Sequence, residues 1–218
     1  MDWQVGDDHT GVSADFKAGN GLKIGQSVII EKDVSVGVNV KIGHRVTLKS
    51  GTIIGNDSTI DDHCITTGAC VIGNNVNIRT GAIISKANII EDCVFIGPGV
   101  ITNHTKHVPH MRPKMESKQL LTVIGYGSII GTQATLLAGV HIGPQSIIGG
   151  GSNVVKGTEG HGVYFGNPCK WVSPLPSQYL IGSEAPNAGR MYLTPEVIMH
   201  MKLYIPNLEW EMPSVHTD

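Results

Sequence analysis

An apolar residue recurs every six positions over most of the chain, and this period limits the possible folds more than any other feature. The repeat runs from Ile24 to Thr102, stops, and resumes from Ile124 to Val154. Eighteen of the twenty anchor residues are aliphatic and none is charged. The anchors are Ile24, Ile30, Val36, Ile42, Leu48, Ile54, Ile60, Thr66, Ile72, Ile78, Ile84, Ile90, Ile96, Thr102, Ile124, Ile130, Leu136, Ile142, Ile148 and Val154.

A second, smaller residue such as Val28 or Val34 stands two places before most anchors. Residues two apart point to the same side of an extended strand, so each hexad predicts a short strand with one inward row. A glycine often follows the anchor, as at Gly25 and Gly43, which indicates a tight corner after each strand. Stacked short strands and corners form a solenoid, and β-branched anchors oppose a helix. The sequence therefore predicts an all-β fold, a parallel β-helix of hexapeptide repeats.

The chain of 218 residues divides into three predicted parts. Residues 1–21 form an N-terminal lead-in, residues 22–156 the β-helix, and residues 157–218 a C-terminal extension. Within the extension, Thr194 and Pro195 resemble the N-cap and first residue of a short helix over about 195–204. Because the last turn of a solenoid exposes unpaired edges, the extension is a candidate cap for that turn.

Charge and hydropathy exclude several classes of partner. The net charge of −2 gives no basic field for nucleic acid, and no run of 18 apolar residues predicts a membrane span. The start of the chain is acidic, unlike a signal peptide, so we expect a cytoplasmic protein. The four cysteines form no C-x-x-C pair, and Cys64 and Cys70 occupy inward positions, which is typical of buried thiols in a reducing compartment.

The repeat is interrupted once, by a segment that differs from the rest of the chain. Thr102 and Ile124 are 22 residues apart instead of six, so 16 residues are inserted, in a loop over about 103–119. The loop holds three of the ten histidines and four of the sixteen Lys and Arg residues. An insertion in a solenoid projects from one face, often the binding face, so we expect this loop to be functional.

The composition of the loop suggests proton transfer beside bound phosphate. Histidine is the side chain with an ordinary pKa near neutrality, and His104 and His107 are both candidates for a general base. Lys106, Arg112 and Lys114 supply positive charge for substrate phosphates.

No metal site is predicted in the loop. The histidines at 104, 107 and 110 are spaced by three, which would bring them together only on a helix. Pro109 and Pro113 oppose a helix there.

Several motifs across residues 22–172 resemble the hexapeptide-repeat acyltransferases. The motifs are Val94-Phe95-Ile96-Gly97-Pro98-Gly99-Val100 before the loop, Ala138-Gly139-Val140-His141-Ile142-Gly143 and Ile148-Gly149-Gly150-Gly151-Ser152-Asn153-Val154-Val155-Lys156 after it, and Gly166-Asn167-Pro168-Cys169-Lys170. The resemblance implies a left-handed β-helix, a homotrimer, acyl-CoA as donor, and active sites between subunits. It implies no permanently bound cofactor, and acetyl-CoA is the first candidate for the co-substrate.

Subgroups of this family suggest different catalytic residues. Galactoside and maltose acetyltransferases carry a base on an equivalent loop, where His107 matches best. Antibiotic acetyltransferases place a histidine after an asparagine, which matches Asn103-His104. Acyltransferases of nucleotide-linked amino sugars resemble the Phe95-Ile96-Gly97-Pro98 segment followed by Thr102-Asn103, and some of them have no histidine there. The choice between His104 and His107 therefore stays open.

The leading hypothesis is a CoA-dependent N-acyltransferase acting on a nucleotide-linked amino sugar by direct transfer. An oxyanion formed at the thioester needs a donor, and the backbone N–H groups of Gly125 and Gly131 are candidates. By the resemblance, Gly149, Lys156 and Lys170 would contact CoA. The alternatives are an O-acetyltransferase of a sugar or antibiotic hydroxyl, and a non-enzymatic β-helix scaffold, although a scaffold has no use for a basic, histidine-rich loop.

Overall fold

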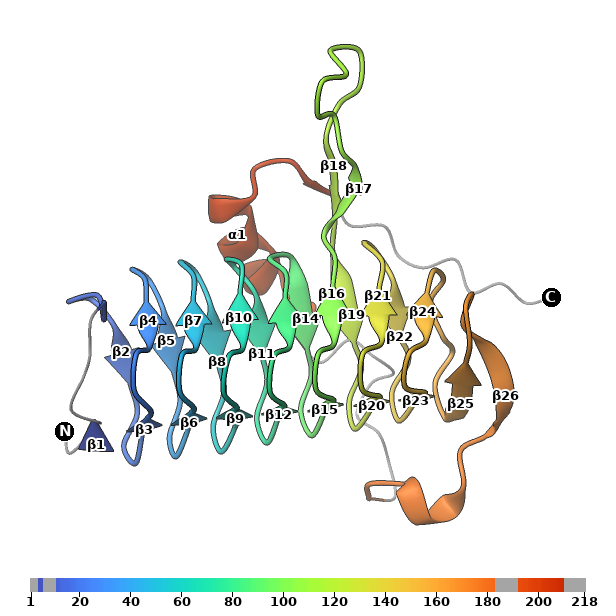
Figure 1. The fold of residues 1–218 in the computed structure, drawn as a ribbon, viewed down its shortest axis with the longest axis horizontal. Helices are drawn as coiled ribbons and strands as arrows, with labels where there is room; N and C mark the ends of the chain where they lie inside the picture. The colour runs from blue at the N-terminus through green and yellow to red at the C-terminus, as the bar shows by residue number, and fades with distance from the viewer. Residues whose placement is uncertain (1–3, 6–10, 183–191, 210–218) are drawn as a thin grey trace.

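The computed structural model describes residues 4–5, 11–182 and 192–209, and in these residues the chain winds into a three-sided prism of parallel strands (Figure 1). The predicted all-β solenoid is confirmed. Successive strands lie on sheets A, B and C in turn, and three strands make one rung of the prism.

Sheet A is the longest face and runs the whole length of the prism. Its strands, in spatial order, are β1 (Gln4–Val5), β3 (Lys23–Ile24), β6 (Lys41–Ile42), β9 (Thr59–Ile60), β12 (Asn77–Ile78), β15 (Phe95–Ile96), β20 (Ile129–Ile130), β23 (Ile147–Ile148), β25 (Gly162–Phe165) and β26 (Lys170–Pro174).

The other two faces have seven strands each. Sheet B holds β4 (Ile29–Ile30), β7 (Thr47–Leu48), β10 (Ile65–Thr66), β13 (Ile83–Ile84), β16 (Ile101–Thr102), β21 (Thr135–Leu136) and β24 (Asn153–Val154). Sheet C holds β2 (Lys17–Ala18), β5 (Ser35–Val36), β8 (Ile53–Ile54), β11 (Val71–Ile72), β14 (Asn88–Ile90), β19 (Thr122–Ile124) and β22 (His141–Ile142).

The register of the strands shows how the period of six builds the prism. Within the repeat, strands on either side of the interruption pair in parallel with the strand 18 residues later, as Ile24 does with Ile42. Across the interruption the offset rises to 34 residues, as between Ile96 and Ile130, and the difference is the 16 inserted residues. All twenty anchors point inward and are at most 7% exposed. The hydrophobic core is therefore one continuous column along the prism axis.

Two different positions are constrained at many of the corners. The left-handed backbone conformation falls three residues before the anchor, where Asp33 and Asn39 adopt it as well as Gly51. The glycine after the anchor is needed because adjacent rungs lie close together there. A Cβ atom on Gly25 would stand 2.6 Å from the carbonyl carbon of Gly43. Glycine is therefore required at these positions by the close approach of the next rung, and not by a left-handed backbone angle.

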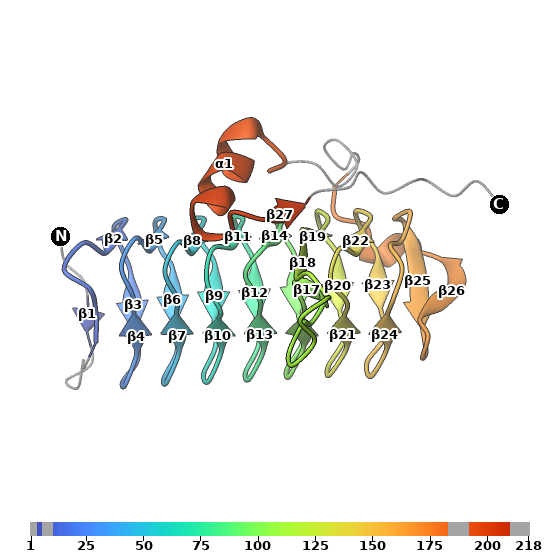
Figure 2. The same ribbon diagram turned by 90° about the horizontal axis from the view of Figure 1, so that it is seen from above.

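The C-terminal extension has two parts with different positions. β25 adds to β23 and then pairs antiparallel with β26, which is followed by a single 3-10 turn, η1 (Ser177–Tyr179). Helix α1 (Pro195–Tyr204) instead lies along the outside of sheet C, near the middle of the prism (Figure 2). Its N-cap is Thr194, whose side chain accepts a hydrogen bond from the Val197 N–H at 3.3 Å. The helix therefore does not cap the last rung.

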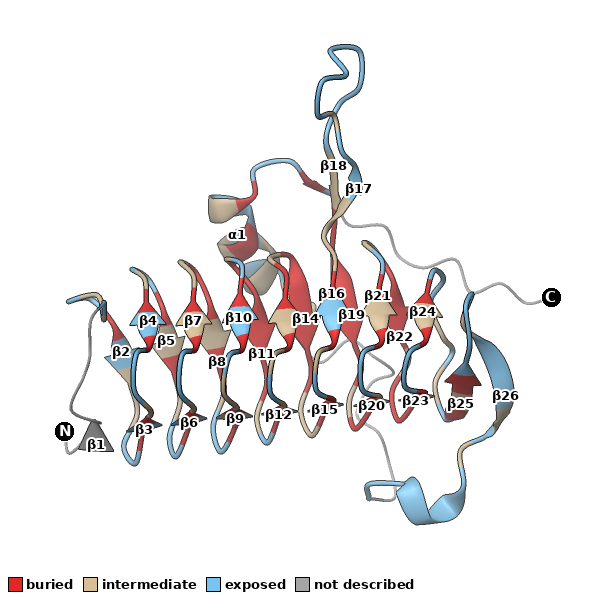
Figure 3. Ribbon diagram, viewed as in Figure 1, coloured by how far each residue is buried: buried red, intermediate tan, exposed pale blue. Residues whose placement is uncertain are grey.

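Helix α1 is held to the prism by a second apolar cluster. Met201, Ile205 and Leu208 are buried against residues of β11, β14 and β19. Sheet C is accordingly buried beneath α1, whereas the inserted segment is largely exposed (Figure 3). Among the described residues, neither helix is long and apolar enough to cross a membrane.

Candidate functional site

The inserted residues form an antiparallel hairpin that stands out from the ridge between sheets B and C (Figure 1). We call residues 103–121 the arm. Its strands are β17 (Thr105–His107) and β18 (Lys118–Leu120), and their register shifts between Thr105 and His107. At the tip, two successive turns are closed by Arg112 N–H to Pro109 O at 2.8 Å and Met115 N–H to Arg112 O at 3.0 Å.

The base of the arm is tied into the prism on both sides. The Asn103 N–H continues the ladder to Leu136 O at 2.9 Å. The Thr122 hydroxyl donates to Asn103 O at 3.2 Å and accepts from the Gly139 N–H at 3.1 Å. Asn103 therefore contributes its backbone to the base of the arm, next to His104.

His104 lies at a corner position that recurs in every rung. The residues two places after the sheet-B anchors form this B–C corner, in the order Lys32, Ser50, Gly68, Lys86, His104, Ala138 and Lys156. Lys86 is thus one rung before His104. Lys156 is two rungs after it, about 10 Å along the axis at ordinary strand spacing. His104 stands between two lysines on the ridge from which the arm rises.

The surroundings of His104 favour its neutral form. Its side chain is half-buried, and burial, followed by the positive charge of Lys86, lowers the pKa of His104 below its ordinary value of 6.5. Its carbonyl oxygen accepts the Leu120 N–H at 2.8 Å, which fixes the backbone of the residue. A neutral imidazole held in place near neutral pH is suited to accept a proton.

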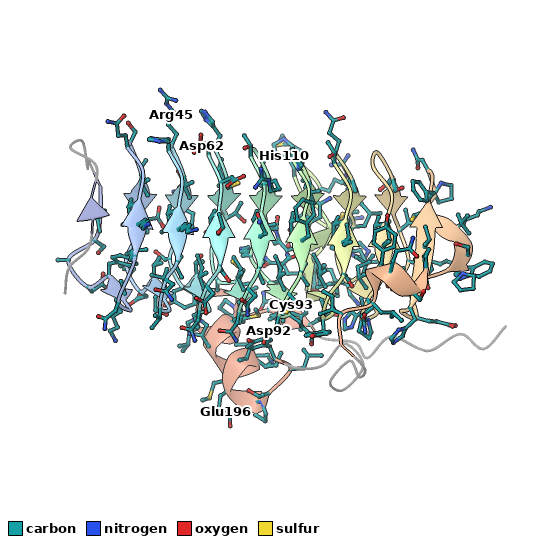
Figure 4. The ribbon with its side chains drawn as sticks, turned by 90° about the horizontal axis from the view of Figure 1, so that it is seen from below. Arg45, Asp62, Asp92, Cys93, His110 and Glu196 are labelled. Carbon is teal, nitrogen blue, oxygen red and sulfur yellow. The ribbon has the colours of Figure 1, made fainter. Side chains whose placement is uncertain are left out.

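The other polar residues predicted on the arm are exposed. His107 lies on β17, while Lys106, Arg112 and Lys114 lie along the hairpin and its tip. The Arg112 guanidinium donates to His110 O at 2.8 Å. His110 leans to the side of the prism away from α1 (Figure 4). These side chains are thus exposed to solvent, whereas His104 is half-buried.

The two glycines proposed as oxyanion donors already use their backbone N–H groups. The Gly125 N–H donates to Ile142 O at 2.9 Å, and the Gly131 N–H donates to Ile148 O at 2.7 Å. An oxyanion donor needs a free N–H directed at the reacting oxygen. The sequence-based assignment of Gly125 and Gly131 is corrected accordingly, since both amides belong to the sheet ladders.

The residues proposed to contact CoA are separated by the fold. Lys156 is exposed at the B–C corner, whereas Lys170 begins β26 at the end of sheet A. The Gly149 N–H donates to Tyr164 O at 2.8 Å. A Cβ on Gly149 would overlap the ring of Phe165, so this ring covers the glycine. Only Lys156 of the three shares a corner with His104.

Lys86 is a residue of this region that the sequence reasoning missed. It precedes His104 by 18 residues, which is the length of one rung. That spacing was visible in the sequence and would have placed the two side chains on one corner.

Two cavities lie far from the arm. They have volumes of about 390 and 490 Å³ and are lined by residues of the first rungs, and only the larger one is also lined by His200 and Tyr204 of α1. No residue of the arm lines either of them.

Comparisons with known proteins agree with this architecture. A family model described as the GMPPB C-terminal domain matches residues 13–120, just under half of the chain. A "Probable macrolide acetyltransferase" of Lysinibacillus sphaericus is 45% identical over 51 residues, which is 23% of this chain. The match spans only 28% of that relative's length.

Two solved structures have similar folds. The polySia-specific acetyltransferase NeuO superposes with a TM-score of 0.62 at 18% identity, covering 92% of this chain and 98% of NeuO. A mutant of AntD, an N-acyltransferase from Bacillus cereus solved with dTDP and coenzyme A, superposes with a TM-score of 0.55 at 18% identity. It covers 75% of this chain and 85% of AntD. The chain is a left-handed parallel β-helix, and its resemblance to the hexapeptide-repeat acyltransferases is confirmed at the level of the fold.

Proposed function

We propose that this chain is an acyl-CoA-dependent N-acyltransferase whose acceptor is an amino sugar linked to a nucleotide. The observation that carries the proposal is the half-buried His104, with its lowered pKa, at the foot of a basic arm. The fold shared with AntD, an N-acyltransferase bound to dTDP and coenzyme A, supports this choice of reaction and acceptor. The basic residues of the arm fit the phosphates that both substrates carry.

In the proposed reaction, the neutral amine attacks the thioester carbonyl carbon of acyl-CoA directly. A C–N bond forms, His104 accepts a proton from the nitrogen, and the C–S bond breaks. The departing CoA thiolate then takes a proton from the imidazolium, which returns His104 to its neutral form. A positioned base of this kind contributes roughly 10²–10⁴-fold to the rate. We assign no oxyanion donor, because Gly125 and Gly131 use their N–H groups in the ladders.

Phosphate binding is divided between the prism and the arm in this proposal. Lys156 binds CoA phosphates on the B–C corner, and acyl-CoA is a co-substrate rather than a resident cofactor. Lys106, Arg112 and Lys114 bind the phosphates of the nucleotide. Because these three side chains are exposed on the arm, they are accessible to a substrate held by a second copy of the chain, and this second copy completes the site in the proposal. A homotrimer with sites between its subunits meets this requirement.

The test is a thiol-release assay with acetyl-CoA and a panel of nucleotide-linked amino sugars. His104→Gln is expected to lower kcat by about 10²–10⁴-fold without changing the CoA affinity. His110→Gln, at the tip of the same arm, is the matched control and should retain near-normal turnover. His107→Gln separates the two candidate bases. Full activity in the His104 variant together with loss of activity in the His107 variant would identify His107 on β17 as the base.

A second candidate function is O-acetylation of a sugar or antibiotic hydroxyl. The sequence match to a macrolide acetyltransferase and the fold shared with NeuO favour it. A neutral hydroxyl is a weaker nucleophile than a neutral amine and gains more from removal of its proton during attack, so O-acetylation would depend more steeply on the base. Thiol release with hydroxyl acceptors alone would replace the N-acyl proposal by this one. If none of the acceptors gave thiol release, a non-enzymatic scaffold would be favoured.

A further inference from the structure

The described part of the C-terminal extension contacts the arm at its foot. We call residues 192–209 the brace. Its last element, β27 (Leu208–Glu209), pairs in parallel with β18, placing Leu208 beside Gln119 and Glu209 beside Leu120. The hairpin is thereby a three-stranded sheet at its foot. Figure 2 shows β27 running from α1 toward β18 across the top of sheet C.

Two polar contacts join β27 to the arm. The Leu121 N–H donates to Glu209 O at 3.2 Å. The Lys118 ammonium lies 2.8 Å from the Glu209 carboxylate, and their side chains are 26% and 52% exposed. This ion pair links the last described residue of the brace to the strand that returns from the tip.

The apolar contacts continue from the brace into the foot of the arm. Leu208, at 4% exposure, belongs to the same buried cluster as Leu121 and Val123, where the arm rejoins sheet C. Met201 of α1 is fully buried in this cluster. A displacement of α1 would therefore open apolar surface at the point where the arm begins.

The brace is also anchored to the prism at positions far from the arm. The Tyr192 hydroxyl donates to the Asp92 carboxylate at 2.5 Å and accepts from the Asn74 amide at 3.1 Å. Within α1, a ring nitrogen of His200 lies 2.9 Å from Gly51 O. Asp92 lies beside the base of α1, while His110 lies on the opposite side of the prism (Figure 4). The brace thus spans several rungs and ends on the arm.

We propose that the brace is a positioning element for the arm, and that Glu209 and Lys118 are positioning residues that set the angle of the hairpin. Two strands alone are marginally stable, whereas a third strand packed on an apolar cluster holds a hairpin rigidly. An effect on turnover is expected only if the acyltransferase activity proposed above is right. The two candidate bases move with the arm, because His104 directly precedes β17 and His107 is its last residue. The effect on the order of the arm does not depend on that activity.

The experiment is hydrogen exchange measured by mass spectrometry on peptides covering residues 101–110. This segment contains β17, which pairs with β18 and not with β27, so its exchange reports the rigidity of the arm rather than lost contact with the brace. Glu209→Lys and Lys118→Glu each place like charges together and should speed exchange there about threefold. The double variant with both exchanges restores opposite charges and should return exchange to the wild-type rate.

Two further variants are measured in the same exchange experiment, one at a buried residue of the brace and one, as a control, at an ion pair away from the arm. Leu208→Ala removes an apolar contact of the brace and should speed exchange in residues 101–110 by about tenfold or more. Arg79→Glu breaks a comparable ion pair, Arg79 to Asp61 at 3.1 Å, away from the arm and should leave this exchange unchanged. Wild-type exchange in both Glu209→Lys and Leu208→Ala, or no rescue in the charge-swapped double variant, overturns the positioning role.

Turnover in the same variants separates this inference from the proposed function. If the arm carries the base, kcat falls in Glu209→Lys, recovers in the charge-swapped double variant, and leaves the KM for acyl-CoA unchanged. Faster exchange with unchanged kcat would support the positioning role of the brace and would contradict a catalytic role of the arm.

Discussion

Replacing one inward anchor and one outward neighbour by alanine tests the packing of the prism quantitatively. Ile96 on β15 is 0% exposed and lies between Ile78 and Ile130 on the adjacent rungs. Ile96→Ala removes three carbon atoms, which at about 0.8 kcal/mol each amounts to roughly 2.4 kcal/mol of transfer free energy. The enclosed cavity raises the expected loss in the free energy of unfolding to about 3–4 kcal/mol.

Ile101 on β16 provides the matched comparison, since it carries the same side chain on the outer face. It is 39% exposed, so truncation removes less buried surface and leaves no enclosed cavity. We expect a loss of about 1 kcal/mol for Ile101→Ala.

Thermal unfolding followed by circular dichroism measures both variants. For a chain of this length, 1 kcal/mol corresponds to a change of about 2–4 °C in Tm. Ile96→Ala should therefore lower Tm by about 6–16 °C and Ile101→Ala by about 2–4 °C. Equal decreases for the two variants would show that the inward and outward rows do not differ in packing, which would refute the reasoning.

Three further predictions concern individual side chains. The positive charge of Lys86 lowers the pKa of His104 in addition to burial, so Lys86→Gln should raise that pKa and move the acid limb of the pH profile of kcat/KM to higher pH. An unchanged acid limb would show that Lys86 does not act on the catalytic base. Gly25→Ala should lower stability more than Gly81→Ala in urea unfolding, because the added Cβ meets backbone at 2.6 Å at Gly25, whereas at Gly81 it meets nothing within 4 Å and the cost is limited to the left-handed φ of +73°. Burial raises the pKa of Cys70 to about 12, so its thiol should react with a maleimide at pH 8 only after unfolding. Because Cys93 and Cys169 are partly exposed, the labelled residue is identified by peptide mass spectrometry, and labelling of Cys70 in the native protein would contradict its burial.

Much of the fold was predictable because it depends on a local, periodic pattern. A strand that is apolar at every second position and turns after each anchor has few ways to bury its inward row, and stacking on its own neighbours is the simplest. The period also located the insertion and its length, which the register between Ile96 and Ile130 confirms. The corner that carries His104 and Lys86 follows from the same 18-residue spacing.

The environment of the candidate site was less predictable. The backbone amide of Gly125 looked available in the sequence, but its N–H belongs to the ladder between rungs. Whether an amide is free depends on the partner strand, and that partner is known only once the register is set. The half-burial of His104 and the exposure of His107 likewise depend on how the hairpin leaves the ridge.

The amino-acid sequence by itself determined the solenoid, its inward rows and the place of its single insertion, because these follow from side-chain periodicity along a short stretch of chain. Only the tertiary structure decided that the C-terminal helix lies on sheet C and that Glu209 meets Lys118 on the arm. Glu209 and Lys118 are 91 residues apart, and the contacts of α1 with sheet C are also between distant segments, so no local pattern encodes such a pairing. They arise because an apolar helix face and an uncovered sheet bury each other.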